Sequence, residues 1–413
     1  MLAILAGTAW RAARLDNRPL HADEAVQAWQ TWNLLEGGGY QYDPLDRHGP
    51  TLYYGSAVLH RLSGGSAADY DDRAARKFSL AAGIATLVLL GFGARTAGFP
   101  AAVGAFAVAA LAFEPLSSLY HTYFVQEASL AFLIWAFLFL LLQSSGPRSN
   151  SQLLMLGFLA GLAQATKETT PLYLLLALIC VGIAKPGSLG RPHRRNIPWA
   201  VAGFLGPFIL FYSSFGANPA GVVDAFRTYV LQTERVGGEV HAYPFWHYLK
   251  IFGIGGQGPI NWCAWGFLLL GLVGMVLSLR PKANPAARAT AWFTLSLLVA
   301  HSLIPYKTPW LMLTPVIGWA LLAGHALSEL ASVRKWGWAL ALALAAGTGL
   351  QSARVSALAL DRYPGDARNL YFYQQAPRSI LRLPERVDRL QSAQSKPLNV
   401  AIVSPEHTWP LPW

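Results

Sequence analysis

Charged side chains are scarce in this 413-residue chain: they make up 13% of it, whereas hydrophobic residues make up 54%. The mean hydropathy is +0.33. This composition excludes an ordinary soluble domain and predicts an all-α polytopic membrane protein. Cysteine is also rare, and Cys180 and Cys263 both lie in apolar runs, so we interpret them as small hydrophobic residues that indicate no redox compartment.

The net charge of +11 does not indicate a nucleic-acid-binding protein. Lysine and arginine fall in short loops between the apolar runs, where they act as topology signals rather than forming a phosphate-binding face. We therefore expect no nucleic-acid partner. The bilayer itself is the expected environment.

Apolar runs of near-spanning length recur along the chain and predict about eleven transmembrane helices. The first run is short, and Arg11 and Arg14 lie near its end. Because the run is short, we expect the chain to lack a few N-terminal residues of a full span. A cleaved signal peptide is disfavoured, since no clear small-residue cleavage site precedes His21. The runs are 1–15, 78–97, 100–119, 128–145, 152–165, 171–184, 197–215, 259–279, 289–304, 309–330 and 336–352.

The distribution of basic loops predicts the topology. Residues 185–195, 280–288 and 334–335 contain lysine or arginine and no acid, so we expect them to be cytoplasmic. Eleven spans place these loops on one side only if 152–184 forms a hairpin whose tip, 166–170, faces outward. The unusual polar clusters then lie on the outer side, in segments 16–77, 120–127, 166–170, 216–258 and 305–308 and in the C-terminal tail.

The outer loop 16–77 carries two adjacent carboxylates, Asp23 and Glu24, directly before an amphipathic stretch that ends at Leu35. Two tryptophans on the apolar stripe of this stretch predict a helix in the membrane interface. A second amphipathic run covers 51–62. The carboxylates are candidates for chemistry, although acids at this position also cap helices and complement their positive end.

Such a layout suits transfer of a sugar from a polyprenyl phosphate. The anomeric carbon of this donor lies at the membrane surface, and its leaving group is already an anion. The reaction needs a carboxylate to take the proton of the acceptor hydroxyl and cations to hold the phosphate charge.

The order of motifs resembles the GT-C superfamily of lipid-phosphate-sugar-dependent glycosyltransferases, especially the protein mannosyltransferase and lipid A aminoarabinose transferase branch. Within it, later motifs are similar to the flippase-activity-associated glycosylation proteins. The matching stretches are His21-Ala-Asp23-Glu24-Ala, Asp43-Pro44, His48-Gly49-Pro50, Gln126-Glu127, Thr166-Lys167-Glu168-Thr169, Lys307-Thr308-Pro309-Trp310 and Glu406-His407 with Trp409 to Trp413.

The resemblance implies a GT-C fold and assigns roles to the acidic residues. Asp23 would be the general base, and Glu24 would orient the base or the acceptor. Glu127 would be a second acidic residue facing Asp23; if the two converge, they could hold a divalent cation, but no cofactor is required by the pattern. The alternative for Glu127 is a helix cap. His21 is either a ligand or a structural hydrogen-bonding residue.

The resemblance also implies cations that meet the lipid phosphate. The aminoarabinose transferase branch has a lysine before the proline of the first outer loop, whereas this chain has Arg47 and His48 there. Lys167 at the hairpin tip could supply the missing charge or pair with its neighbour Glu168. Lys307 is either a site residue or a lysine that extends toward the interface.

We expect two parts: a GT-C transmembrane domain over 1–352 and an extracytoplasmic segment over 353–413. The latter reads as a small α/β domain, incomplete or unusually small, with a helix at 379–391 and a buried strand at 398–403. The predicted function is sugar transfer with inversion to a lipid, glycan or protein acceptor at the outer face of the cell (inner or plasma) membrane. The alternatives are a lipid-linked-sugar flippase and a noncatalytic component of a glycosylation complex.

Overall fold

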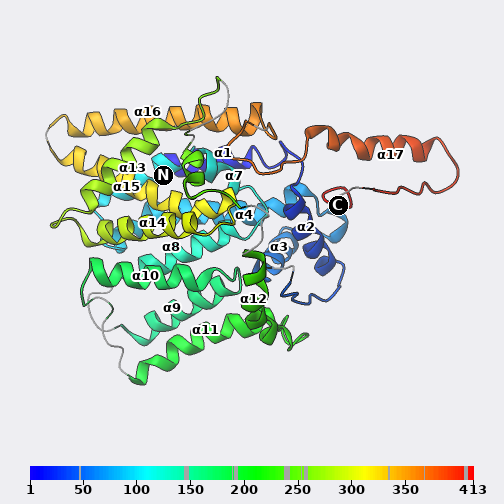
Figure 1. Ribbon diagram of the computed structural model, residues 1–413, viewed down its shortest axis with the longest axis horizontal. Helices are drawn as coiled ribbons and strands as arrows, with labels where there is room; N and C mark the ends of the chain where they lie inside the picture. Colours follow the sequence, from blue (N-terminus) through cyan, green and yellow to red (C-terminus); the bar gives the residue numbers. More distant parts are fainter. Residues whose placement is uncertain are drawn as a thin grey trace.

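The computed structural model describes residues 1–45, 48–143, 148–187, 189, 194–236, 242–252, 254, 259–333, 335–366, 368–403 and 408–413. Long helices run side by side along the molecule, and two shorter ones, α2 and α3, cap one end (Figure 1). The helices of the bundle are α1 (Leu2–Ala12), α4 (Asp72–Val88), α5 (Ala94–Thr96), α6 (Ala101–Leu111), α7 (Pro115–Tyr120), α8 (Glu127–Gln143), α9 (Asn150–Gln164), α10 (Thr170–Ala184), α11 (Ile197–Tyr212), α13 (Trp265–Ser278), α14 (Pro285–Leu303), α15 (Leu313–Val333) and α16 (Gly337–Ala357).

Each of the eleven apolar runs coincides with one of these helices or with a consecutive pair. Two helical stretches, Asp72–Thr96 and Pro309–Val333, are long and apolar enough to cross a bilayer, and five more apolar helices are shorter. The number of spans therefore stays a prediction. The hairpin at 166–170 is confirmed, since α9 ends at Gln164 and α10 begins at Thr170.

The helix that follows the outer loop, α4, begins six residues earlier than the apolar run at 78–97 suggested. Asp71 caps it by accepting a hydrogen bond from the Ala74 backbone N–H at 2.7 Å. Its first turns carry Arg76, which is fully buried. A hydropathy pattern misses the first turns of such a helix, because they contain a charged residue that is nevertheless buried.

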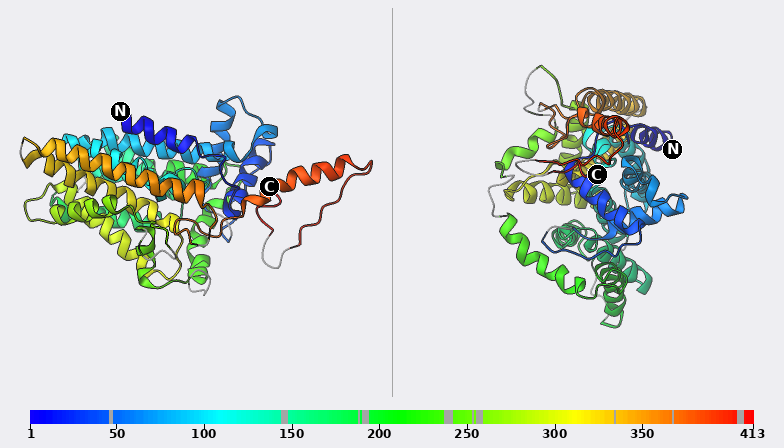
Figure 2. Two further views of the ribbon diagram at one scale, coloured as in Figure 1. Left: turned by 90° about the horizontal axis from the view of Figure 1, so that it is seen from above. Right: turned by 90° about the vertical axis from the view of Figure 1, so that its right-hand side faces the viewer.

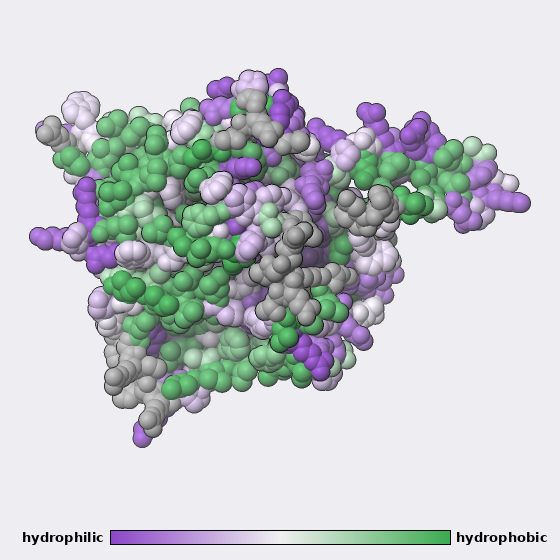
Figure 3. All heavy atoms as spheres, viewed as in Figure 1, coloured by the Kyte–Doolittle hydropathy of each residue, from purple (hydrophilic) through white to green (hydrophobic). Residues whose placement is uncertain are grey.

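The core of the bundle surrounds α15, which packs against α6, α8, α13, α14 and α16. The side chains of α15 are almost wholly buried, whereas α10, α11 and α13 expose large apolar residues. Hydrophobic atoms cover much of the long side of the bundle, and hydrophilic atoms gather toward its ends (Figure 3). Apolar residues both inside and outside are expected of helices that lie in lipid.

Glycines bring α9 and α11 into close contact at the edge of the bundle. A methyl group on Gly157 would lie 2.1 Å from the backbone oxygen of Ala200, and one on Gly161 would lie 2.2 Å from that of Phe204. Gly203 approaches the Leu154 oxygen in the same way. The Gly157-x-x-x-Gly161 spacing is the small-residue pattern of close helix pairs in membranes.

The outer loop forms α2 (Ala22–Leu35) and α3 (Thr51–Leu62), so both expected amphipathic stretches are confirmed as helices, while the place of α2 in the membrane interface stays a prediction. His21 begins α2 through a capping box: its Nδ1 accepts from the Asp23 backbone N–H, and the Glu24 side chain accepts from the His21 backbone N–H. A further helix, α12 (Gly221–Val236), lies beside this end of the bundle (Figure 2).

The basic loops lie at the opposite end. The ends of α10 and α15 and the starts of α11 and α16, which border two of these loops, are at the left of Figure 1, away from α2 and α3. Asn284, before α14, donates to the Gly98 oxygen at 2.9 Å, which ties another connection to this end. The grouping agrees with the predicted topology, while the assignment of this end to the cytoplasm stays a prediction.

The C-terminal segment differs from the expected α/β domain. Its helix, α17 (Leu383–Ser392), projects away from the bundle (Figures 1 and 2), and no described residue between 353 and 413 forms a strand. Residues 398–403 are largely exposed, with Val403 93% accessible. A single extended segment has no neighbouring strand to pair its backbone groups, so hydrophobic alternation alone does not make it a strand.

Candidate functional site

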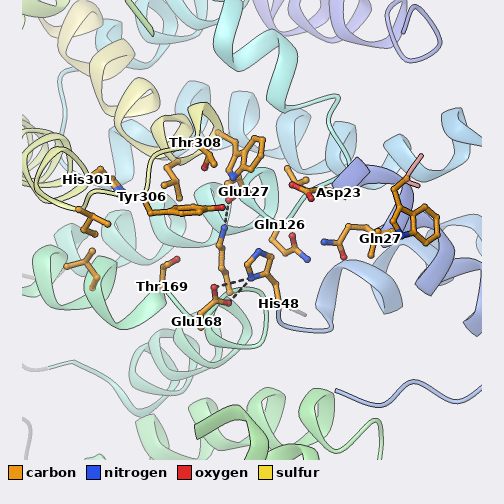
Figure 4. Close-up of a pocket in the computed structure, with 18 residues that line it drawn as sticks. Asp23, Gln27, His48, Gln126, Glu127, Glu168, Thr169, His301, Tyr306 and Thr308 are labelled. Atoms are coloured by element: carbon orange, nitrogen blue, oxygen red, sulfur yellow. Dashed lines mark hydrogen bonds and ion pairs between the residues drawn. The ribbon is translucent and has the colours of Figure 1, made fainter. Parts of the chain in front are cut away.

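A cavity of about 430 Å³ lies at the end of the bundle that carries α2. Most of its lining comes from four segments: the start of α2, the start of α8, the turn between α9 and α10, and the stretch from α14 to α15 (Figure 4). His48, before α3, and Trp409, in the C-terminal tail, complete it. All six segments belong to the outer side of the predicted topology. The lining residues are Asp23, Val26, Gln27, His48, Val125, Gln126, Glu127, Lys167, Glu168, Thr169, Leu172, His301, Ile304, Tyr306, Thr308, Trp310, Leu311 and Trp409.

Asp23 presents a partly free carboxylate to this cavity. Its side chain is 52% accessible, and the nearest ion-pair partner, His21 Nδ1, is 3.8 Å from its Oδ2. The His21 ring is buried beside Tyr123, Trp310 and Tyr373. Because that ring accepts the Asp23 backbone N–H, it fixes the first turn of α2 and hence the direction of the carboxylate.

Glu24, the adjacent acid, lies elsewhere and does not line the cavity. Its carboxylate is fully buried and accepts hydrogen bonds from both Arg76 Nε (2.9 Å) and Arg76 Nη2 (3.0 Å). Arg18 Nη2 at 3.3 Å and two backbone N–H groups complete the set. Burial alone would raise the pKa of Glu24, but the charges of Arg76 and Arg18 outweigh it and lower the pKa to about 2.

Of the two roles expected of Glu24, orienting the base or orienting the acceptor, this enclosed network is compatible with the first. Arg76 Nη1 also donates to the Leu15 and Arg18 oxygens, so the ion pair joins α4 to the chain that enters α2. The amide of Phe124 binds the same carboxylate at 2.9 Å. Glu24 and Arg76 therefore join three segments next to Asp23: α4, the stretch before α2 and the stretch before α8.

Lys167 and Glu127 form a buried ion pair in the cavity wall (Figure 4). The two side chains are 6% and 5% accessible. Burial alone would lower the pKa of Lys167, but the charges of Glu127 and Glu168 outweigh it and raise the pKa. Of the two alternatives for Lys167, the ion pair with its neighbour Glu168 is not the one formed, because its hydrogen bond goes to Glu127.

Glu168 pairs instead with His48, whose Nδ1 lies 3.0 Å from the carboxylate. Burial alone would raise the pKa of Glu168, whereas the charges of His48 and Lys167 lower it to about 2. His48 is 34% accessible and lines the cavity, and its ring also contacts the buried carboxylate of Glu168. Arg47, the other expected phosphate ligand of this loop, lies outside the described residues.

Lys307 is buried but turns away from the cavity. Its Nζ donates to the Ser302 oxygen at 3.0 Å and to the Ile304 oxygen, so it caps the carboxyl end of α14. Its neighbours Tyr306 and Thr308 line the cavity instead. The expectation that Lys307 binds the lipid phosphate is therefore not supported by its placement.

The residues present do not fit a metal ion. In the part of the chain that the structure describes, no group of three or more histidine, cysteine, aspartate or glutamate side chains could hold one. Glu127 is already paired with Lys167, so the proposed pair of Asp23 and Glu127 offers one free carboxylate. A divalent cation at this pair would take most of its oxygen ligands from water or from the donor phosphate.

Several polar lining residues were missed by sequence reasoning. Gln126, Thr169 and Thr308 each have a buried side-chain atom without a hydrogen-bond partner among the described residues, and so does Gln27. Gln27 could have been found, since it follows Asp23 by four residues and so shares its helix face. Thr169 and Thr308, like Gln126, stand within the motifs that match the family, next to the charged residues to which roles were assigned.

Comparisons with known proteins agree with this fold. Residues 47–213, less than half of the chain, match the family model "Dolichyl-phosphate-mannose-protein mannosyltransferase". No curated protein sequence matches the chain.

Solved structures are similar over nearly the full chain. ArnT from Cupriavidus metallidurans bound to undecaprenyl phosphate has 16% identity and a TM-score of 0.65, over 99% of this chain and 83% of that one. The oligosaccharyltransferase AglB from Archaeoglobus fulgidus, in complex with an inhibitory peptide and a dolichol-phosphate, has 12% identity and a TM-score of 0.61, over 100% and 60%. The predicted resemblance is thus confirmed for the fold: this chain has the architecture of the GT-C glycosyltransferases.

Proposed function

We propose that this protein transfers a sugar from a polyprenyl-phosphate donor to an acceptor hydroxyl at the outer face of the membrane, with inversion. The observation that carries the proposal is the half-exposed carboxylate of Asp23 in a cavity that also contains the buried Lys167–Glu127 pair. A base and a cation within one cavity meet the two chemical needs of this reaction. The GT-C architecture supports the same reaction class.

Asp23 acts as the general base. The acceptor oxygen attacks the anomeric carbon as its proton passes to the Asp23 carboxylate, and the bond from the anomeric carbon to the phosphate oxygen breaks. The bonding electron pair stays on that oxygen, so polyprenyl phosphate leaves as an anion and the anomeric configuration inverts. The accessible Asp23 carboxylate can reach an acceptor, whereas the enclosed carboxylate of Glu24 cannot.

Lys167 stabilises the leaving phosphate. Its ammonium group is held in the cavity wall by Glu127, and the raised pKa keeps it charged throughout the neutral range. A phosphate oxygen can share this ammonium group with Glu127, because an ammonium group has three donors. His48 stands beside it on the same wall.

The apolar part of the lining suits the polyprenyl chain. Leu172 lies on α10 and Ile304 directly follows α14, and both helices expose large apolar side chains that would face lipid in a membrane-embedded bundle. The acceptor, which can be a lipid, a glycan or a protein, approaches from the opposite side, where Asp23 is open. We place the protein in the cell membrane as a multi-pass protein with this cavity on the extracytoplasmic side.

The test is sugar transfer by the purified chain in lipid, with radiolabelled sugars on undecaprenyl phosphate as donors. Asp23→Asn is expected to lower the transfer rate by about 10²–10⁴-fold, the usual contribution of a general base. Asp16→Asn is the matched control, since Asp16 lies in the same loop and forms an exposed pair with Arg73.

Unchanged transfer by Asp23→Asn would refute the assignment of the base. A wild-type protein that moves the labelled lipid between leaflets without transferring its sugar would instead establish the flippase alternative. Activity in neither assay would favour a noncatalytic component of a glycosylation complex.

A further inference from the structure

The side chain of Gln126 is the most conspicuous polar group in the cavity that the proposed chemistry does not use. It precedes α8 and is only 1% accessible, yet it lines the cavity. Neither its amide nitrogen nor its amide oxygen has a hydrogen-bond partner among the described residues. Gln27, on α2, is 7% accessible, and its amide oxygen is also unpaired within that part of the chain.

An unpaired buried amide is costly, because the hydrogen bonds that its groups made with water are lost and not replaced. Such groups persist where a ligand or an ordered water completes them. A carboxamide offers two donors and two acceptor sites. Its best partners therefore both donate and accept while carrying no charge, which describes the hydroxyl groups of a sugar.

The position of the two amides points to the transferred sugar. Gln126 is the residue before Glu127, which holds Lys167, and Gln27 lies one turn along α2 from Asp23. Figure 4 shows Gln126 between Glu127 and Gln27, with Asp23 beside them. In an inverting displacement the sugar ring lies between the leaving phosphate and the attacking acceptor. Lys167 marks the first of these positions and Asp23 the second.

We propose that Gln126, together with Gln27, forms a recognition subsite that hydrogen-bonds the hydroxyl groups of an uncharged sugar on the donor lipid. This inference rests on the proposed function and adds the class of sugar. Trp310, which lines the same cavity, offers an apolar ring against which a sugar can lie. The subsite recognises the sugar and leaves binding of the phosphate to Lys167.

The experiment compares lipid binding by the full chain in detergent micelles, using tryptophan fluorescence or thermal stabilisation. The probes are bare undecaprenyl phosphate, the same lipid carrying mannose, glucose, galactose or arabinose, and the same lipid carrying a 4-amino sugar. Wild-type protein is expected to bind at least one neutral sugar lipid more tightly than the bare lipid. Gln126→Leu, of similar volume, is expected to weaken binding of that sugar lipid by about tenfold, the value of one lost hydrogen bond to a buried group. Its affinity for the bare lipid is expected to stay unchanged.

Ser129→Ala is the matched control. Ser129 is 7% accessible, its hydroxyl has no partner among the described residues, and it lies in the first turn of α8 without lining the cavity. Its loss is expected to leave every lipid affinity unchanged. Gln27→Leu provides a second variant from a different helix, so a folding defect of Gln126→Leu would not decide the outcome.

Three results would overturn the inference. Equal weakening of bare and sugar-carrying lipid would make Gln126 part of the phosphate site. No effect on any lipid, in either glutamine variant, would mean that a bound water completes these amides. Preference for the 4-amino sugar would assign the cavity to a cationic sugar. If Asp23→Asn still lowers transfer in these cases, the proposed function holds without the sugar subsite. If the wild-type protein neither transfers nor distinguishes any sugar lipid, the proposed function and the sugar subsite are both refuted.

Discussion

Removing the charge of Glu24 tests whether this acid supports the site or takes part in the chemistry. Glu24→Gln would leave Arg76 and Arg18, 0% and 2% accessible, without a counter-charge. Loss of one partner of a buried ion pair costs about 3–5 kcal/mol. For a chain of this size that corresponds to a fall of roughly 5 °C in the melting temperature.

The assay is thermal unfolding of the purified protein, monitored alongside sugar transfer. Asp16→Asn is again the control, because its pair with Arg73 is exposed and contributes little. The pH dependence adds a second measurement. A pKa lowered from 4.5 to about 2 means that Glu24 stabilises the fold fully above pH 4.5 and that this stabilisation is lost as the pH falls toward 2. The wild type should therefore lose more stability than Glu24→Gln over this pH range.

The reasoning would be refuted by a particular combination of results. If Glu24→Gln melts at the wild-type temperature, keeps the wild-type acid sensitivity and still loses transfer, then Glu24 acts on the substrate and the network around it is incidental. Loss of stability with transfer reduced only in proportion to folded protein is the expected result.

The remaining predictions concern the cations, the helix contacts and the tail. Lys167→Gln is expected to weaken undecaprenyl phosphate binding by about tenfold or more, the value of a charge-assisted hydrogen bond, while Lys167→Arg retains binding. Lys307→Gln should lower the melting temperature with unchanged lipid affinity, because it caps α14. Gly161→Ala should destabilise the protein by about 1–3 kcal/mol through overpacking, whereas Gly206→Ala, with nothing within 4 Å, should be tolerated in the same melting assay. Trp413→Phe removes a 2.7 Å hydrogen bond to the carboxylate of Asp72 and should lower the melting temperature slightly; an unchanged value would mean that the tail is not anchored there.

Much of the fold could be predicted from local sequence. Hydropathy located the bundle helices, and amphipathic spacing gave α3 its observed bounds, Thr51–Leu62. These properties depend on residues within one helix, so a single sequence contains them. The prediction of a strand at 398–403 was wrong because a strand depends on pairing with a neighbouring strand, which local sequence does not specify.

The candidate site was predicted less completely. Asp23, Glu127, Lys167 and His48 were all named from motifs, and the structure brings them to one cavity. Lys307 came from the same kind of motif, yet its side chain turns toward the end of α14. A motif identifies a residue and its approximate depth, while the direction of its side chain depends on the surrounding helices.

The sequence by itself determined that this is a helical membrane protein with its polar clusters at one end, because hydropathy and charge placement follow from composition along the chain. Only the tertiary structure decided how two adjacent acids differ. Arg76, 52 residues further along the chain, folds back to enclose Glu24, while Asp23 remains open to the cavity. Contacts between distant segments set burial and pairing, and these decide which carboxylate can exchange a proton with a substrate.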